Sequence, residues 1–267
     1  MSDPFSDVIH TSIWQEQAEA HNPFAAAVCR ASGYDVFGDV IGKATYIEYL
    51  FLLFRGERPT PEQARALEIL AIALANPGPR DPSVHAAMAT GASGTPAATS
   101  LIAALAPGAG GHGGAREVFL AMELFSARGT DPADWEASLS MPTQVSRSGI
   151  WPASEHPPGF DAYCAVATTP VVQTLTLLAS ILPASALAWL ARERITVEAW
   201  AGHGLAMTGV CASTLLALGF SADAGEMLSL LLRLPGAAVH ALEQRRQGFR
   251  QFPFFELDLQ NDPAKRQ

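Results

Sequence analysis

The segment PGAGGHGGA at residues 107–115 is the stretch from which the fold and the function of this chain can be argued. His112 is the one side chain in it with acid–base chemistry, because an imidazole donates or accepts a proton near neutral pH. The glycines around it let the backbone turn through positive φ and come close to a ligand. The pattern favours a functional site, and the alternative is a helix C-cap followed by a tight turn.

Helical patterns dominate the chain on both sides of this segment. Residues 45–54 carry apolar side chains on one stripe, and residues 97–106 also have a helical pattern. A further helix is expected after Thr60, which is placed as its N-cap with Pro61 and Gln63 in the first turn. This helix is expected to end before residues 76–79. Strand signals are scarce. The sequence therefore predicts an all-α fold.

Composition and charge exclude several classes of protein. The 267 residues are 49% hydrophobic, with a formal net charge of −9 and a pI near 5.2, which argues against a nucleic-acid partner. Cys29, Cys164 and Cys211 are odd in number and far apart, so we expect neither a disulfide framework nor a thiolate metal site. The histidine spacing also predicts no metal site. We expect a cytoplasmic protein, since residues 1–7 do not resemble a secretory signal.

The uncharged segment 162–191 is long enough to be mistaken for a membrane span. It contains repeated threonines, and Pro170 and Pro183 divide it into pieces. Buried helices of a large α-helical core are therefore the preferred interpretation, and no membrane partner is expected.

Residues 108–113 match the glycine spacing of a dinucleotide-binding fingerprint. That fingerprint follows a strand in a βαβ unit, whereas residues 97–106 look helical. A dinucleotide site is therefore disfavoured. Farther along, residues 126–160 are rich in proline, serine and glycine, which predicts a boundary or a loop-rich subdomain.

Three sets of residues carry a resemblance to a known family. The first is GYD at 33–35 leading to LLFRGERPT at 52–60, and the second is an apolar helix running into HGGA at 112–115. The third is RLPG at 233–236, continuing through His240 to Glu243 and Gln244. Together they resemble the citrate synthase superfamily, which includes citryl-CoA lyase and the C-terminal part of ATP-citrate lyase.

The resemblance implies an almost wholly helical homodimer whose smaller domain closes over a cleft in the larger one. The large domain is expected at residues 22–115 and 205–255, and the small domain at 116–204. Residues 1–21 and 256–267 are expected to be terminal extensions. The implied substrates are a small carboxylate and a coenzyme A thioester, without a metal.

The resemblance also implies roles for particular residues. His112 matches the histidine that stabilises the enol of the acyl thioester, as a donor aimed at developing oxyanion charge does. Arg233 matches an arginine that binds a substrate carboxylate, and Arg250 resembles a late arginine that does the same across the dimer. Coenzyme A is expected to approach the backbone of Pro107, Gly108, Ala109, Gly110 and Gly111.

Three positions depart from the family pattern. Pro77 and Ala162 fall where the family has histidines, and Thr208 falls where it has an aspartate base. We expect other groups to take over these roles if the fold brings them to the cleft. The candidates are Asp161, which we predict to be catalytic with His112, and the histidines His85, His156 and His203.

Three functions follow from this pattern. The protein forms or breaks a carbon–carbon bond next to a CoA thioester on a non-standard substrate, or it is a citryl-CoA lyase-like subunit. Alternatively, it has lost catalysis and serves as a ligand-binding or partner protein. Because His112, Arg233 and Arg250 match groups that bind a thioester and an anion, an enzyme is the preferred prediction.

Overall fold

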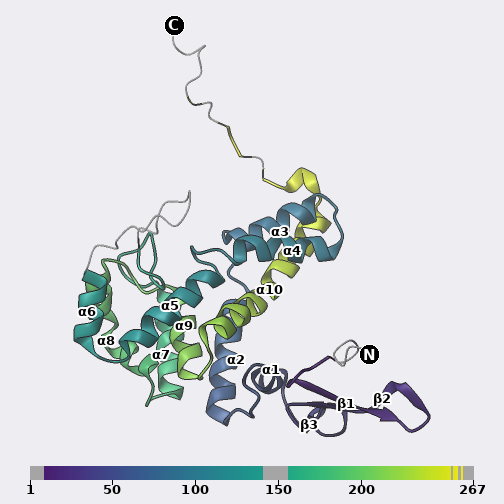
Figure 1. Ribbon diagram of the computed structural model, residues 1–267. Helices are drawn as coiled ribbons and strands as arrows, with labels where there is room; N and C mark the ends of the chain where they lie inside the picture. Colours follow the sequence, from purple (N-terminus) through teal and green to yellow (C-terminus); the bar gives the residue numbers. More distant parts are fainter. Residues whose placement is uncertain (1–8, 141–155, 254, 258–259, 261–267) are drawn as a thin grey trace, which may run out of the picture. The chain divides into compact units, whose positions relative to one another are not determined.

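The computed structural model of the chain describes residues 9–140, 156–253, 255–257 and 260 (Figure 1). Contacts divide the chain into two compact units. Unit 1 holds Met1–Leu74 and Ala109–Leu232, and unit 2 holds Ala75–Gly108 and Arg233–Gln267. These bounds differ from the expected division, in which residues 116–204 form a closing small domain; that division stays a prediction. Part of the expected loop-rich segment, residues 141–155, lies outside the described residues.

Helices make up most of the described chain, which confirms the all-α prediction. The helices of unit 1 are η1 (Val36–Val40), α1 (Tyr46–Arg55), α2 (Pro61–Ala75), α5 (Ala115–Arg128), α6 (Pro132–Ser140), α7 (Thr169–Ile181), α8 (Ala186–Ala201) and α9 (Met207–Ala217). Unit 2 contains α3 (Pro82–Ala92), α4 (Ala97–Gly108) and η2 (Phe249–Gln251). Helix α10 (Ala222–Gln247) belongs to unit 1 up to Leu232 and to unit 2 beyond it.

Helix α9 lies in the centre of unit 1. Every residue from 209 to 215 is buried, as expected for a helix that is apolar all round. Helix α5 packs along α9, and the surrounding core includes Phe51, Leu70 and Met122. The first turns of α5 and α9 are thereby held within reach of each other in the same unit.

A three-stranded antiparallel sheet precedes α1 and was not expected from the sequence. It consists of β1 (Trp14–Glu19), β2 (Asn22–Ala31) and β3 (Tyr34–Asp35), with Trp14 opposite Ala31. All of β1 is exposed. No buried face therefore imposes the alternation of apolar and polar residues by which strands are recognised in a sequence. The signal that was available is the Ser32-Gly33 pair, where both residues have positive φ, as in a two-residue hairpin turn.

Helix α1 begins with a reciprocal cap. The Thr45 hydroxyl accepts the N–H of Glu48, and the Glu48 carboxylate accepts the N–H and the hydroxyl of Thr45. The predicted start of α2 is confirmed, because Thr60 and Gln63 exchange the same kind of bonds. Both helices begin within one residue of the predicted positions.

The cap of α1 makes a testable contribution to stability. The hydrogen bonds donated by the backbone and the hydroxyl of Thr45 lower the pKa of Glu48. A carboxyl with a lowered folded-state pKa stabilises the fold above its unfolded pKa, and this stabilisation is lost as the pH falls through the folded value. We expect Thr45→Ala to cost about 1 kcal/mol at pH 7 and less near pH 3. Urea unfolding at both pH values measures this, and an equal loss at both would contradict it.

The buried cluster of unit 2 consists of small side chains. Helices α3 and α4 pack on each other, and Val84, Ala87 and Ala241 belong to a buried cluster. A Cβ added at Gly91 would lie 2.4 Å from the Ala241 carbonyl oxygen, so α3 and α10 touch through their backbones. Helix α4 continues to Gly108, two residues beyond the helix expected from the sequence.

In the part of the chain that the structure describes, no helix combines the length and the apolar character needed to cross a bilayer. The uncharged segment 162–191 instead contains α7 and the start of α8, with Pro183 between them.

Candidate active site

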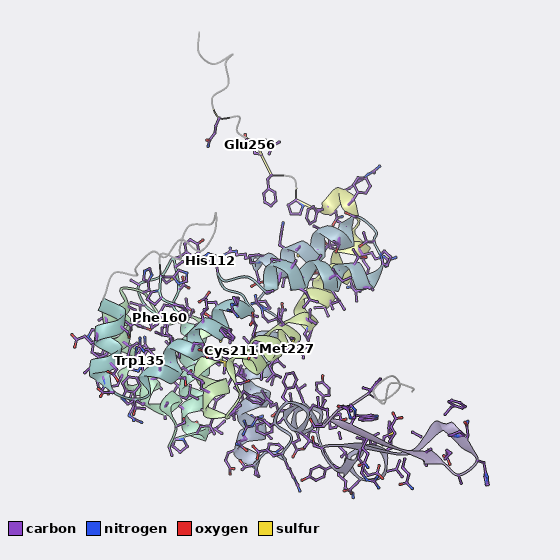
Figure 2. All side chains as sticks on the ribbon, viewed as in Figure 1. His112, Trp135, Phe160, Cys211, Met227 and Glu256 are labelled. Atoms are coloured by element: carbon purple, nitrogen blue, oxygen red, sulfur yellow. The ribbon has the colours of Figure 1, made fainter. Side chains whose placement is uncertain are left out.

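His112 lies in the loop between α4 and α5, and its side chain is exposed (Figure 2). Gly113, next to it, has a φ of 70°, a left-handed conformation that favours glycine. Gly114 is the N-cap of α5, so the imidazole stands just before the positive end of a helix dipole. Negative charge on a ligand is stabilised at such a position. The imidazole is therefore placed where it can donate a hydrogen bond to an anion or to a polarised carbonyl oxygen.

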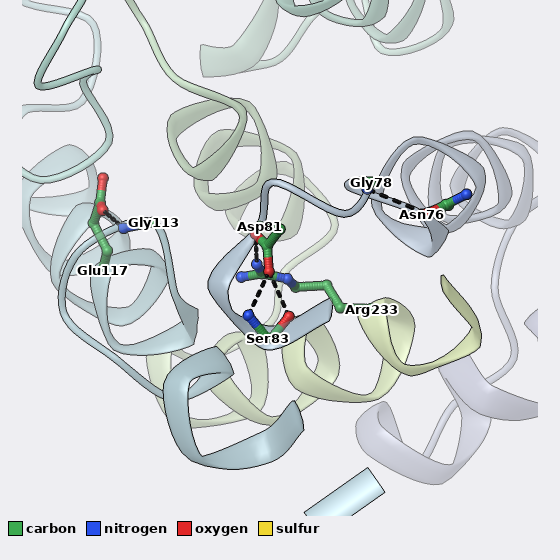
Figure 3. A network of polar contacts seen from close by, with 7 residues as sticks. All are labelled: Asn76, Gly78, Asp81, Ser83, Gly113, Glu117 and Arg233. Atoms are coloured by element: carbon green, nitrogen blue, oxygen red, sulfur yellow. Dashed lines mark hydrogen bonds and ion pairs between the residues drawn. The ribbon is translucent and has the colours of Figure 1, made fainter. Parts of the chain in front are cut away.

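Glu117 in the first turn of α5 holds this loop in place. The residue is 2% exposed, and its Oε2 accepts the N–H of Gly113 (Figure 3). Oε1 accepts the N–H of Gly159 at 3.0 Å and the hydroxyl of Thr208 at 2.9 Å. One buried carboxylate thus connects the His112 loop, the segment around Gly159 and the start of α9. Sequence reasoning missed Glu117; the available signal was an acid in the first turn of the helix that follows the glycine-rich loop.

Three imidazoles of unit 1 form a row, called here the histidine row: His112, His156 and His203. The ring centroids of His112 and His156 are 6.1 Å apart, and those of His156 and His203 are 6.0 Å apart. His156 is only 6% exposed, whereas His112 at one end is exposed. Two of the histidines considered as replacements for missing family groups are thereby brought next to one another, and one of them next to His112.

Backbone pairing positions His203. Phe160 and Leu205 form an antiparallel bridge, and the N–H of Asp161 donates to the Gly204 carbonyl at 2.7 Å. His203 Nδ1 then lies 2.9 Å from the Asp161 carbonyl oxygen. A carbonyl oxygen can only accept, so this contact makes Nδ1 a donor.

The Asp161 side chain shapes the loop that follows it. Its Oδ1 accepts the N–H of Tyr163 at 2.8 Å and the N–H of Cys164 at 3.2 Å. Asp161 therefore reaches the histidine row through its carbonyl oxygen, while one carboxylate oxygen accepts from two backbone amides. Its catalytic role stays a prediction.

The three departures from the family pattern lie in different surroundings. Thr208 is half-buried and its hydroxyl donates to Glu117. Ala162 is exposed in the loop after the Phe160 bridge, and Pro77 is exposed directly after α2. None of the three side chains can take up a proton at neutral pH.

In unit 2, Arg233 forms an ion pair with Asp81. Arg233 Nη2 lies 2.5 Å from Asp81 Oδ2, and the two side chains are 12% and 15% exposed (Figure 3). The other carboxylate oxygen of Asp81 accepts the N–H and the hydroxyl of Ser83, which caps α3. The guanidinium predicted to bind a substrate carboxylate is therefore engaged by a carboxylate of the chain itself.

The remaining predicted residues lie as follows. Arg250 is exposed on η2. Pro107 and Gly108 are the last residues of α4 in unit 2, and Ala109, Gly110 and Gly111 follow in unit 1. A Cβ added at Gly111 would meet open space, so its backbone is accessible to a ligand.

Two other histidines have contacts in unit 2. The ring of His85 packs against Phe252, with ring centroids 5.7 Å apart. His240 Nε2 lies 3.1 Å from Asn76 Oδ1. Over residues 9–140 and 156–253, no group of three or more His, Cys, Asp or Glu side chains is arranged to hold a metal ion.

The arrangement of helices defines the class of fold: it is a citrate synthase-like fold. No protein-family model and no curated protein matches the sequence. Solved structures do match it. The chain is similar to citryl-CoA lyase from Hydrogenobacter thermophilus, with a TM-score of 0.69 and 18% identity; the match covers 97% of this chain and 99% of that chain.

Two further solved structures are similar. ATP citrate lyase from Methanothrix soehngenii, in complex with citrate and coenzyme A, has a TM-score of 0.69 and 17% identity, and the match covers 98% of this chain but 44% of that chain. The third structure is citrate synthase from Thermoplasma acidophilum in a ternary complex with carboxymethyl coenzyme A and oxaloacetate. It has a TM-score of 0.56 and 16% identity, and the match covers 84% of this chain and 60% of that chain. At these identities the similarity establishes the fold.

Proposed function

We propose that this protein is an enzyme that forms or cleaves a carbon–carbon bond between an acyl-CoA thioester and a keto acid, of the citryl-CoA lyase or citrate synthase type. The observation that carries the proposal is the exposed His112 imidazole, which stands before the N-terminus of α5 and next to a second imidazole, His156. The fold supports it, because similar structures contain citrate with coenzyme A, or a coenzyme A derivative with oxaloacetate.

His112 supplies a hydrogen-bond donor to the thioester oxygen. In either direction of the reaction the carbon next to the thioester becomes an enolate, and its negative charge spreads onto that oxygen. A donor that is already in place stabilises this charge more than it stabilises the neutral thioester. The helix N-terminus at Gly114 acts in the same direction, since it also favours negative charge.

The other predicted residues complete the proposed site. Arg233 and Arg250 bind the carboxylates of the keto acid, because a planar guanidinium makes two parallel charge-assisted bonds. Residues 107–111 contact coenzyme A through their backbone, and Asp161 is the second catalytic candidate. The proposed assembly is a homodimer in which Arg250 contributes to the site of the second copy, and the proposed reaction needs no metal.

The test is a direct assay of both reactions with the purified full chain. We expect cleavage of citryl-CoA, or condensation of acetyl-CoA with oxaloacetate, and we expect His112→Ala to lower kcat by about 10²–10³-fold. His21→Ala is the matched control, because His21 is exposed in the turn between β1 and β2. Full activity of His112→Ala would contradict the assigned role, and an inactive wild-type protein would contradict the proposed reaction.

A catalytically degenerate protein that binds a ligand or a partner is the second candidate. Two observations favour it: the base position holds Thr208, whose hydroxyl donates to Glu117, and Arg233 is already paired with Asp81. This candidate predicts no turnover in either assay. Calorimetric titration with coenzyme A then shows whether the fold retains ligand binding.

A further inference from the structure

Arg233, which the proposed function assigns to a substrate carboxylate, is held in unit 2 by a carboxylate of the chain itself. Its Nη2 lies 2.5 Å from Asp81 Oδ2, and the two side chains are 12% and 15% exposed. An ion pair in such a mostly buried position is screened by solvent much less than an exposed pair. A ligand carboxylate that binds this guanidinium must therefore compete with Asp81.

Asp81 is the fixed member of the pair. Its Oδ1 accepts the N–H of Ser83 at 2.9 Å and the Ser83 hydroxyl at 2.5 Å, and its own N–H donates to the Gly78 carbonyl at 3.1 Å. Figure 3 shows the Ser83 bonds and the Arg233 contact meeting at the Asp81 carboxylate. Arg233 has a long side chain with many rotamers. When the pair separates, Arg233 is therefore the side chain that moves.

Capping of α3 does not explain the second carboxylate oxygen of Asp81. A matched case lies in unit 1, where Asp131 precedes Pro132 as Asp81 precedes Pro82, and its Oδ1 accepts the N–H of Ala133 at the same distance of 2.9 Å. Asp131 is exposed, and it forms no ion pair within the described part of the chain. One oxygen is thus enough for this kind of helix start, which asparagine and serine also provide. The contact of Asp81 Oδ2 with Arg233 is a separate feature.

We propose that Asp81 is an internal competitor for the carboxylate site at Arg233, and this rests on the role of Arg233 in the proposed function. Without ligand, Asp81 holds the guanidinium. A substrate carboxylate binds by taking the place of Asp81 on Arg233, which exchanges one charge-assisted contact for another. The exchange leaves the Asp81 carboxylate without its partner in a mostly buried position, which is unfavourable. Asp81 therefore lowers the affinity of every ligand that is bound through Arg233.

The experiment is calorimetric titration of the full chain with citrate. Asp81→Asn keeps an oxygen for the N–H of Ser83, and its NH2 group then faces Arg233 with donor against donor, which releases the guanidinium. We expect this variant to bind citrate about 10–100-fold more tightly than the wild-type protein, because more of the protein is in the binding-competent state. Asp131→Asn is the matched control, and it should change the affinity by less than about twofold, since an exposed charge is screened.

A second variant tests whether the gain acts through Arg233. Removing a negative charge could also favour an anion without any release of the guanidinium. Asp81→Asn combined with Arg233→Met has no guanidinium to release, so we expect it to lose the gain in citrate affinity. A gain that persists in this double variant, or an equal gain in Asp131→Asn, would overturn the proposed competition.

Binding and turnover separate this inference from the proposed reaction. Tighter citrate binding by Asp81→Asn in a protein without turnover would support the competition and reject the reaction. Turnover by the wild-type protein, with unchanged citrate affinity in Asp81→Asn, would overturn the competition alone. No citrate binding by either protein would overturn the competition together with the role of Arg233.

Folding of the variants has its own readout. If Asp81→Asn does not fold, Asp81→Ser takes its place, because serine also caps a helix. Citrate is expected to restore folding of either variant, since a ligand that binds only the native state stabilises it by mass action. Failure of citrate to do so would overturn the proposal.

Discussion

Replacing Glu117 with alanine is expected to be the most damaging single change in unit 1. It removes the acceptor for the N–H groups of Gly113 and Gly159 and for the hydroxyl of Thr208, at a position that is 2% exposed. The N–H of Gly159 is buried and the hydroxyl of Thr208 is half-buried, and each such group left without a partner costs about 1–3 kcal/mol, so the total is about 2–6 kcal/mol. This is a large fraction of the ~5–15 kcal/mol by which domains are stable. Urea unfolding followed by tryptophan fluorescence measures it, because Trp135 is buried in this unit.

A graded series makes the Glu117 prediction specific. Glu117→Gln keeps one oxygen acceptor but turns an NH2 group toward a donor, so we expect a loss of about 1–3 kcal/mol. Glu123→Ala is the matched control, because Glu123 is exposed on the same helix and should change stability by less than about 0.5 kcal/mol. Equal stability of Glu117→Ala and Glu123→Ala would show that the carboxylate does not connect the three segments.

Replacing Arg233 with methionine is expected to destabilise unit 2 by about 3–5 kcal/mol, because it leaves the Asp81 carboxylate without its partner in a mostly buried position. The tryptophans at 14, 135, 151, 189 and 200 all lie outside unit 2. Hydrogen–deuterium exchange of peptides from α3 and α10 is therefore the suitable measurement, and faster exchange should be concentrated there.

Two further variants control for the Arg233 result. Arg65→Met breaks an exposed pair with Glu68, whose side chains are 58% and 48% exposed, and we expect a loss of less than about 1 kcal/mol. Changing Asp81 to leucine together with Arg233→Met removes both charges and should recover much of the stability, apart from the lost α3 cap. No recovery in the double variant would mean that Arg233 acts through contacts other than Asp81.

Local signals predicted most of the helices. The start of α2 was predicted from Thr60, Pro61 and Gln63, and its end from residues 76–79, because caps and prolines act within one turn. The sheet at residues 14–35 was missed because β1 is exposed along its whole length. Without a buried face, apolar and polar residues need not alternate along the strand. The helical pattern at residues 97–106 ends two residues before α4 does, and Pro107 lies in the last turn of this helix.

The candidate site was predictable only in part. His112 was found because glycines surround it, and this pattern is local. Glu117 was missed because nothing in the sequence shows that Gly159 and Thr208, 42 and 91 positions away, donate to its carboxylate. The engagement of Arg233 by Asp81, 152 positions earlier, was likewise invisible.

The sequence by itself determined the helical class of this protein, the loop that presents an imidazole, and the absence of an acid at position 208, because these depend on residue identity and on neighbours within a few turns. Only the tertiary structure decided that His156 stands beside His112 and His203 beside His156, and that Nδ1 of His203 donates to the Asp161 carbonyl. The physical reason is that these properties depend on contacts between segments distant in sequence, such as the Phe160–Leu205 bridge, which form only when the core around α9 is packed.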